Sequence, residues 1–158
     1  MHQLRFAGRI VLTMVCIGTV AVVFAAAPDA KIQPGQWRST DTVIELSNST
    51  MSADLIARRK SKPAVLEYCV RSDDIAAMLG VGSDKMGLCS GAINIAGGKI
   101  SILRNCMTGL GKGTRKIEGT YTMTRVDTLR EVTQDMPSGA PSHSKTHVVS
   151  ERIGECPR

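Results

Sequence analysis

Five cysteines are the side chains with the most distinctive chemistry in this chain of 158 residues. Cys16 lies in an apolar N-terminal stretch, and the other four are Cys69, Cys89, Cys106 and Cys156. Their spacings of 20, 17 and 50 residues include no Cys-x-x-Cys unit and match no common zinc site. Because an even number of cysteines in an exported chain indicates disulfides, a redox or metal role is the less favoured alternative.

The histidines offer few routes to metal binding or catalysis. His143 and His147 share one face of an expected strand, at a spacing that suits a zinc or copper ion. Lys145 lies between them on the same face, which disfavours a bound cation, and the sequence suggests no third ligand. We therefore expect no metal and no other cofactor, and hydrolysis near these two histidines is the least favoured functional hypothesis.

Two further motifs have explanations that need no catalysis. Residues 109–114 resemble a phosphate-binding loop, but Lys112 is followed by a glycine and a strand pattern, whereas a P-loop continues into a helix. Asp73 and Asp74 fit the first turn of a short helix, where carboxylates are favourable. The chain also contains no Gly-x-Ser-x-Gly nucleophile elbow, so we expect no enzyme activity.

One dense basic cluster is a candidate binding surface. Arg58, Arg59, Lys60 and Lys62 fall within the polar segment 47–63, which we interpret as a loop. Such a cluster suits the negative charge of lipid headgroups or glycans. The simpler interpretation is a solvated loop.

Aromatic side chains are scarce, at 3% of the residues. Outside the N-terminal stretch the chain has only Trp37, Tyr68 and Tyr121. This scarcity argues against a platform for stacking bases, and we expect no nucleic-acid partner. Trp37 and Tyr121 are the candidate binding residues for a small apolar ligand or for a segment of an envelope protein.

The N-terminus has the three parts of a secretory signal: a basic start, an apolar run and small residues. Because Pro28 would follow a cut after Ala27, we favour cleavage after Ala25. This makes residues 1–25 a signal peptide and residues 26–158 a single mature domain in the periplasm. The alternative is an uncleaved anchor in the inner membrane, since the apolar run of about 18 residues is at the lower limit for a span.

A local argument selects one of the three connectivities that four cysteines allow. Gly97 and Gly98 suit a two-residue type I′ turn. In the hairpin that this turn defines, Cys89 lies directly opposite Cys106 at a non-hydrogen-bonded pair, which is close enough for a disulfide. The same register places four isoleucines on the cysteine face, namely Ile93, Ile95, Ile100 and Ile102. The two remaining cysteines then pair by elimination.

The elements that must position these side chains are mostly strands. Ser72 is the expected cap of a short helix that ends before Gly80, and Val126-Asp127 is an expected turn. Besides the two strands of the hairpin, strands are expected at 36–46, 65–70, 114–124, 129–134 and 143–153.

Within 114–124, Arg115, Ile117 and Tyr121 alternate with an entirely polar set of residues. The length of the chain allows one domain, and closely spaced strands joined by short turns predict an antiparallel meander. We predict an all-β fold of about six to seven strands, as a curved sheet, partial barrel or sandwich, with one short helix and two disulfides.

Several landmarks together resemble the bacterial domain-of-unknown-function family 3617. Residues 34–37 resemble its Pro-Gly-x-Trp opening, residues 69–74 its segment around the first cysteine, and residues 152–157 its Arg-x-Gly-Asp/Glu-Cys ending. Segment 47–63 departs from the family, whose members often carry a Met/Pro-rich insert there. The resemblance implies an exported, periplasmic protein, and it supplies neither an activity nor catalytic residues.

These observations predict a non-catalytic binding or interaction module of the cell envelope. The alternative is a surface protein that contacts anionic lipid or glycan through the Arg58–Lys62 loop. A hydrolase is less favoured than either.

Overall fold

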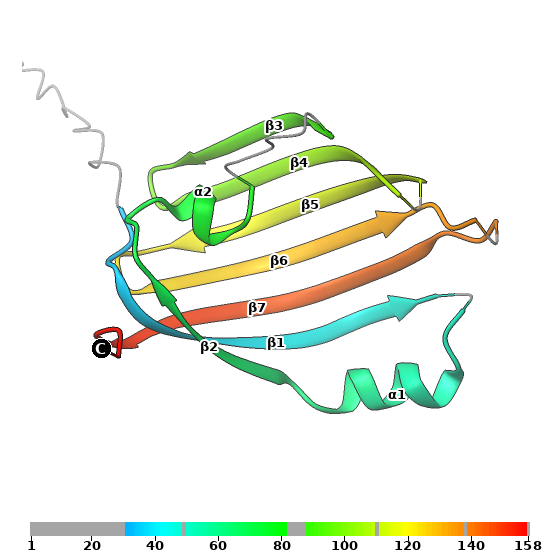
Figure 1. Ribbon diagram of the computed structural model, residues 1–158, viewed down its shortest axis with the longest axis horizontal. Coiled ribbons are helices and arrows are strands. Elements are labelled where there is room, and N and C mark those ends of the chain that lie inside the picture. Colours follow the sequence, from blue (N-terminus) through cyan, green and yellow to red (C-terminus); the bar gives the residue numbers. More distant parts are fainter. Residues whose placement is uncertain (1–30, 49, 82–87, 110, 138, 158) are drawn as a thin grey trace, which may run out of the picture.

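The computed structural model describes residues 31–48, 50–81, 88–109, 111–137 and 139–157 (Figure 1). The predicted signal peptide of residues 1–25 and its cleavage site lie outside the described residues. Within the described part of the chain, neither helix has the length and apolar character needed to cross a membrane.

Seven antiparallel strands form one curved sheet in the order β2-β1-β7-β6-β5-β4-β3 (Figure 1). The sheet stays open because β2 and β3 are edges, so the prediction of an all-β curved sheet is confirmed and no sandwich forms. The strands are β1 Gly35–Ser47, β2 Ala64–Val70, β3 Cys89–Ala96, β4 Lys99–Thr108, β5 Gly111–Tyr121, β6 Arg125–Gln134 and β7 Ser142–Gly154.

The β3–β4 hairpin has the register that its turn predicts. Ala96 pairs with Lys99, and Cys89 pairs with Cys106. Both turn glycines have positive φ, 57° and 76°, as a type I′ turn requires.

Alternation along the strands gives the sheet two chemically different faces. The face against which α2 (Ile75–Met78) packs is called the inner face. It bears Trp37, Ile102 and Ile117, whose side chains are at most 1% exposed. Ile32, from the segment before β1, completes this core, whereas Val132 near the end of β6 is 37% exposed although it shares the inner face. The core therefore fills one end of the inner face and leaves the other end open.

The helix α2 begins two residues later than the sequence predicts, since its N-cap is Asp74 and not Ser72. Asp74 is its N-cap and accepts from the amide of Ala76 at 2.8 Å. Ser72, the predicted cap, accepts instead from the amide of Asp74 at 3.0 Å. Both Ser72 and Asp74 have side chains that can cap a helix, and Asp74 caps this one because it directly precedes the first helical residue.

A second helix, α1 (Ala53–Ser61), corrects the interpretation of segment 47–63 as a loop. Ser52 caps it by accepting from the amide of Leu55 at 3.3 Å. None of its side chains is buried, so no apolar periodicity marked it in the sequence. Capping and good helix formers, not burial, account for this helix.

The predicted turn at Val126-Asp127 is also wrong, because both residues lie within β6. The chain turns at residues 122–124, which contain neither Gly nor Pro. There Thr122 makes the turn, since its hydroxyl accepts from the amide of Arg125 at 3.1 Å. Serine and threonine hydroxyls stabilise such turns in place of the usual turn residues.

Two disulfides close the fold, with the predicted connectivity. Cys89–Cys106 links the two strands of the hairpin, and Cys69–Cys156 links edge strand β2 to the segment after β7. Since β1 lies between β2 and β7, the second bridge holds the chain end across three strands.

Candidate functional site

The two aromatic candidates lie in the core. Trp37 is 0% exposed, and its indole N–H donates to the carbonyl of Gln33 at 3.1 Å. Tyr121 is 5% exposed and borders a surface cleft of about 440 Å³ between α2 and β3. The apolar end of the inner face is thus occupied by the chain's own Ile32, Ile75 and Leu79.

The two adjacent carboxylates, Asp73 and Asp74, have structural partners. Asp73 pairs with Lys31 at 2.8 Å, and hydrogen bonding between them lowers the pKa of Asp73 and raises the pKa of Lys31. Asp74 caps α2. Each carboxylate therefore accepts from its own donor, the Lys31 ammonium for Asp73 and the backbone amide of Ala76 for Asp74.

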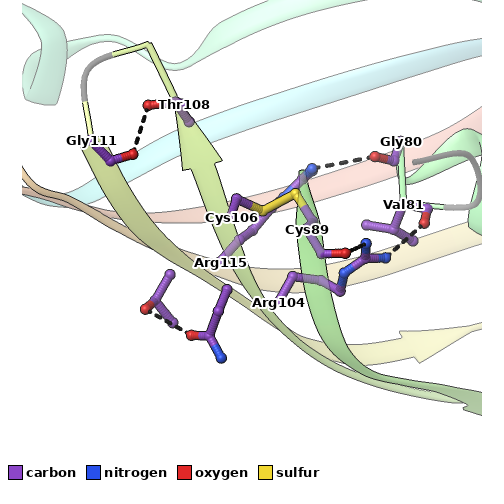
Figure 2. The surroundings of a disulfide bond; sticks show 10 residues. Gly80, Val81, Cys89, Arg104, Cys106, Thr108, Gly111 and Arg115 are labelled. Atoms are coloured by element: carbon purple, nitrogen blue, oxygen red, sulfur yellow. Dashed lines mark hydrogen bonds between the residues drawn. A yellow bond between two sulfur atoms is a disulfide. The ribbon is translucent and has the colours of Figure 1, made fainter. Parts of the chain in front are cut away.

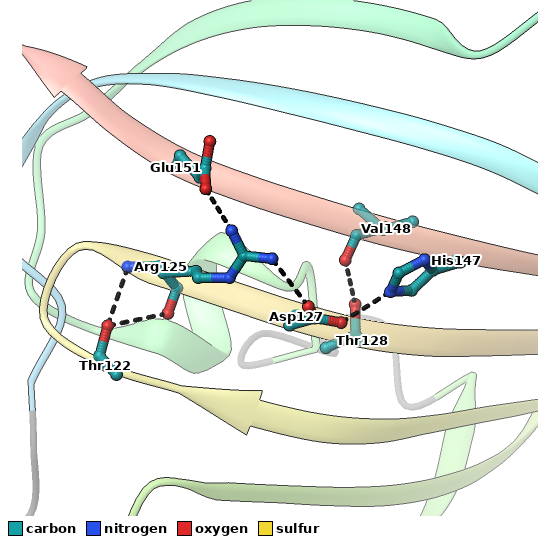
Figure 3. A network of polar contacts seen from close by, with 7 residues as sticks. All are labelled: Thr122, Arg125, Asp127, Thr128, His147, Val148 and Glu151. Carbon is teal, nitrogen blue, oxygen red and sulfur yellow. Dashed lines mark hydrogen bonds and ion pairs between the residues drawn. The ribbon is translucent and has the colours of Figure 1, made fainter.

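Both histidines lie on the outer face and contact acidic side chains there, and Figure 3 shows the surroundings of His147. His147 Nε2 lies 2.7 Å from Asp127 Oδ1, and Arg125 donates to Asp127 Oδ2 at 3.0 Å and also contacts Glu151. The hydrogen bond with His147 is the main reason that the pKa of Asp127 is lowered. These contacts join charged side chains of β6 and β7 across the surface of the sheet, as stabilising cross-strand ion pairs do.

His143 and Lys145 share one carboxylate, that of Glu45, at 3.5 and 3.6 Å. The two histidines are thus separated by a cation and engaged by different acids. No group of three or more His, Cys, Asp or Glu side chains gathers in the part of the chain that the structure describes.

The basic cluster lies on α1 and its end. Arg58, Arg59 and Lys60 form the last turn, and Lys62 is the C-cap residue. All four are exposed, and within the described residues none makes an ion pair. Arg59 and Lys62 line a cleft of about 330 Å³ together with Ala64, the first residue of β2.

Exposed apolar side chains accompany these cations. Leu55 on α1 is 44% exposed, and Val65 and Leu66, which follow Ala64, are 61% and 64% exposed. Leu66 shares the face of β2 on which Ala64 borders this cleft, whereas Val65 points to the opposite face. Leu55, Leu66 and the four cations are therefore called the α1–β2 surface: Leu55, Arg58, Arg59, Lys60, Lys62 and Leu66. It combines positive charge with apolar contact area, a pairing that suits a lipid interface.

A further basic group, which the sequence reasoning missed, lies on the inner face. Arg104 on β4 is the register partner of Arg115 on β5, and Arg130 on β6 lies diagonally across from Arg115. In the sequence, each of these arginines alternates in step with the apolar residues of its own strand, which indicates that it lies on the apolar face. This signal was usable only once the pairing of those strands was known.

Two of these arginines hold the chain after α2 (Figure 2). Arg115 donates to the carbonyls of Leu79 at 3.0 Å and Gly80 at 3.4 Å. Arg104 donates to the carbonyls of Cys89 at 2.8 Å and Val81 at 3.3 Å. Burial is the main reason that the pKa of Arg115 is lowered, and the neighbouring arginines add to it.

Comparison with known proteins places the chain in one family. The family model described as "Protein of unknown function (DUF3617)" matches residues 32–156, a range that includes all four paired cysteines. No curated protein and no solved structure matches the chain. Because the family model covers almost the whole described domain, the resemblance seen in the sequence landmarks is confirmed, and the chain belongs to DUF3617, a family of proteins of unknown function.

Proposed function

We propose that this protein is exported to the periplasm and acts as a non-catalytic interaction module of the cell envelope. Its contact with the envelope is the α1–β2 surface, and its partner there is anionic phospholipid. The two disulfides support export, since such bonds persist in oxidising compartments. The sequence of residues 1–25 supports it independently.

The observation that carries the lipid contact is a cluster of four exposed, unpaired cations beside exposed apolar side chains. Several other surface cations of the sheet have acidic partners, as in Arg38–Glu67 and Lys116–Glu118. A basic residue close to an anionic bilayer contributes about 1 kcal/mol, and inserted apolar groups add to this. The α1–β2 surface has both features, and Asp54 is the only acid of α1.

An apolar ligand on the inner face has less support than this surface. Trp37 and Tyr121 are buried against the chain itself, so a ligand there would have to displace α2 or Ile32. Hydrolysis at the histidines likewise has little support, because their ring nitrogens face Glu45 and Asp127.

Charge reversal at α1 tests the proposed contact. We expect wild type to sediment with vesicles of phosphatidylglycerol and phosphatidylcholine, and binding to fall steeply as salt shortens the Debye length from about 30 Å to about 8 Å. Arg58→Glu/Arg59→Glu should weaken binding by at least about tenfold, given roughly 1 kcal/mol for each basic residue. Lys99→Glu/Lys112→Glu is the matched control, since it reverses two exposed cations far from α1 along the chain.

The apolar part of the surface has its own pair of variants. Leu66→Ser should weaken vesicle binding, whereas Leu103→Ser, at an outer-face position that is 47% exposed, should leave it unchanged. Equal binding by wild type and the Arg58→Glu/Arg59→Glu variant, at any salt concentration, would end the proposal of lipid contact.

Intact mass spectrometry tests export separately. Protein recovered from the periplasm should have the mass of residues 26–158, with four hydrogens fewer than the reduced chain because both disulfides are formed. A full-length mass in the membrane fraction would instead support the uncleaved anchor. A full-length mass in the cytoplasm would contradict export.

A further inference from the structure

The inner face carries three arginines in adjacent positions on three neighbouring strands. Arg104 and Arg115 are direct partners across β4 and β5. Arg115 is opposite Val132 on β6, and Arg130 precedes Val132 by one step of the same face. All three side chains are partly buried, so the positive charges are close together and only partly hydrated.

This arrangement of arginines destabilises the folded protein when no ligand is bound. Like charges at neighbouring cross-strand positions destabilise a sheet, and partial burial reduces the screening by water. Arginine keeps its charge, so the repulsion is not relieved by loss of a proton. A cluster of this kind calls for an anion.

The acids of the sheet do not supply that anion. Glu45, Glu67, Glu118, Asp127 and Glu151 make their ion pairs with cations of the outer face. Asp41 shares the inner face, but it lies on β1, with β7 between it and β6, and it accepts from the hydroxyl of Ser39 at 2.7 Å. Among the described residues, the acids of the sheet therefore leave Arg115 and Arg130 without an acidic partner.

The hydrogen bonds of Arg115 and Arg130 lead to the same conclusion. In the part of the chain that the structure describes, the Arg115 guanidinium donates only to backbone carbonyls, and Nε of Arg130 is buried with no hydrogen-bond partner. Within the described residues, neither guanidinium has a carboxylate at ion-pair distance. A buried donor without a partner is costly, and a bound ligand or water is a usual reason for one.

Space for a small ligand adjoins this group. A cavity of about 170 Å³ lies at the open end of the inner face, and Arg115, Val132, Gln134 and Gly113 are among the residues that line it. This volume corresponds to roughly five or six water molecules, at about 30 Å³ for each. Of the three arginines, Arg115 lines this cavity, and Arg130 is the register partner of the core residue Ile117, so the group lies where the apolar core meets the uncovered end of the sheet.

We propose that Arg115 and Arg130 form a binding site for a phosphate group at the open end of the inner face. Guanidinium forks bind phosphate oxygens in a bidentate manner, and a dianionic phosphate balances two cations better than a single carboxylate does. Arg104 and Arg115 also fix the chain after α2, so one edge of the site is held in place. The site is independent of the α1–β2 surface.

Thermal unfolding with inorganic phosphate tests the site. At constant ionic strength, replacing chloride by phosphate should raise the Tm of the wild type by several degrees, because the ligand binds the folded state only. Arg130→Gln should abolish this rise, and Arg130→Lys should reduce it, since lysine keeps the charge without the fork. Arg38→Gln, at an outer-face arginine paired with Glu67, is the matched control and should keep the full rise.

Arg130→Gln also tests the site in the absence of phosphate, through its Tm. The side chain of Arg130 makes no hydrogen bond or ion pair within the described residues, so Arg130→Gln should fold and should have a Tm at least equal to that of the wild type. An equal phosphate-dependent rise in wild type and Arg130→Gln, or no rise in either, would overturn the proposed site. A lower Tm of Arg130→Gln without phosphate would also contradict it, because Arg130 would then be structural.

The phosphate group has two sources, a soluble phosphate or a phospholipid headgroup. If the source is a headgroup, Arg130→Gln should weaken binding to phosphatidylglycerol vesicles, and inorganic phosphate should compete with the vesicles. If the source is soluble, vesicle binding should be unaffected by Arg130→Gln while the phosphate-dependent rise in Tm is lost. Because Arg58→Glu/Arg59→Glu should keep the rise in Tm, failure of the lipid contact and failure of this site are distinguishable.

Discussion

Replacing both cysteines of the Cys69–Cys156 disulfide by alanine is expected to lower the free energy of unfolding by about 4 to 5 kcal/mol. The bridge joins residues 87 positions apart, so its loss releases a long loop in the unfolded chain. It also holds edge strand β2 to the segment after β7, with β1 between them. Typical domains are stable by only about 5 to 15 kcal/mol, so this loss is a large part of the total.

The hairpin disulfide provides the comparison. Cys89 and Cys106 are 17 positions apart, so the same loop-entropy argument gives a loss of about 3 kcal/mol when both are replaced by alanine. Urea unfolding of the two double variants, followed by the fluorescence of Trp37, the only tryptophan, measures both losses. A larger loss for the hairpin variant than for the Cys69→Ala/Cys156→Ala variant would contradict the argument from loop length.

The disulfides were predictable because the decisive information was local. The turn at Gly97-Gly98 sets the register of β3 and β4, and this register places Cys89 opposite Cys106. The isoleucine pattern agrees with the same register, so two independent signals pointed to one pairing. The second bridge then followed by elimination, without knowledge of the order of strands.

The elements that escaped prediction lack such local signals. No side chain of α1 is buried and only Ile56 is partly buried, so the helix has no apolar stripe that a sequence pattern could reveal. The turn before β6 depends on the hydroxyl of Thr122, in a segment whose residue types suit a strand equally well. In both places a single side-chain hydrogen bond decides the local structure, and composition does not reveal it.

One of the two candidate sites could be predicted from a local sequence signal, and the other could not. The basic residues of α1 were visible as a run in the sequence, and the structure adds the exposed Leu66 on the same face of β2 as the cleft that Arg59 and Lys62 line. The inner-face arginines are 11 and 15 positions apart in sequence, and only the pairing of three strands brings them together. Sequence periodicity gives the face on which a residue lies, but not its neighbours across the sheet.

Trp37→Ala is expected to lower the free energy of unfolding by about 3 to 5 kcal/mol, through the loss of a large side chain from a packed core. Trp37 is 0% exposed and is the largest of the fully buried side chains. It packs where β2, β1 and β7 meet, since Tyr68 and Arg152 are its register partners. The indole also donates to Gln33, so its removal leaves that carbonyl without this donor. Circular dichroism during urea unfolding measures the loss without relying on the fluorescence of the deleted residue.

Trp37→Phe separates packing from hydrogen bonding, because phenylalanine retains most of the apolar volume and loses the N–H that bonds Gln33. Its loss should be only about 1 to 2 kcal/mol, near the cost of one hydrogen bond with some change in packing. Folded Trp37→Phe should also bind anionic vesicles as the wild type does, since Trp37 is absent from the α1–β2 surface. If Trp37→Phe kept full stability but lost vesicle binding, Trp37 would be a binding residue. The assignment of the aromatic core to stability, and of envelope contact to the α1–β2 surface, would then have to be reversed.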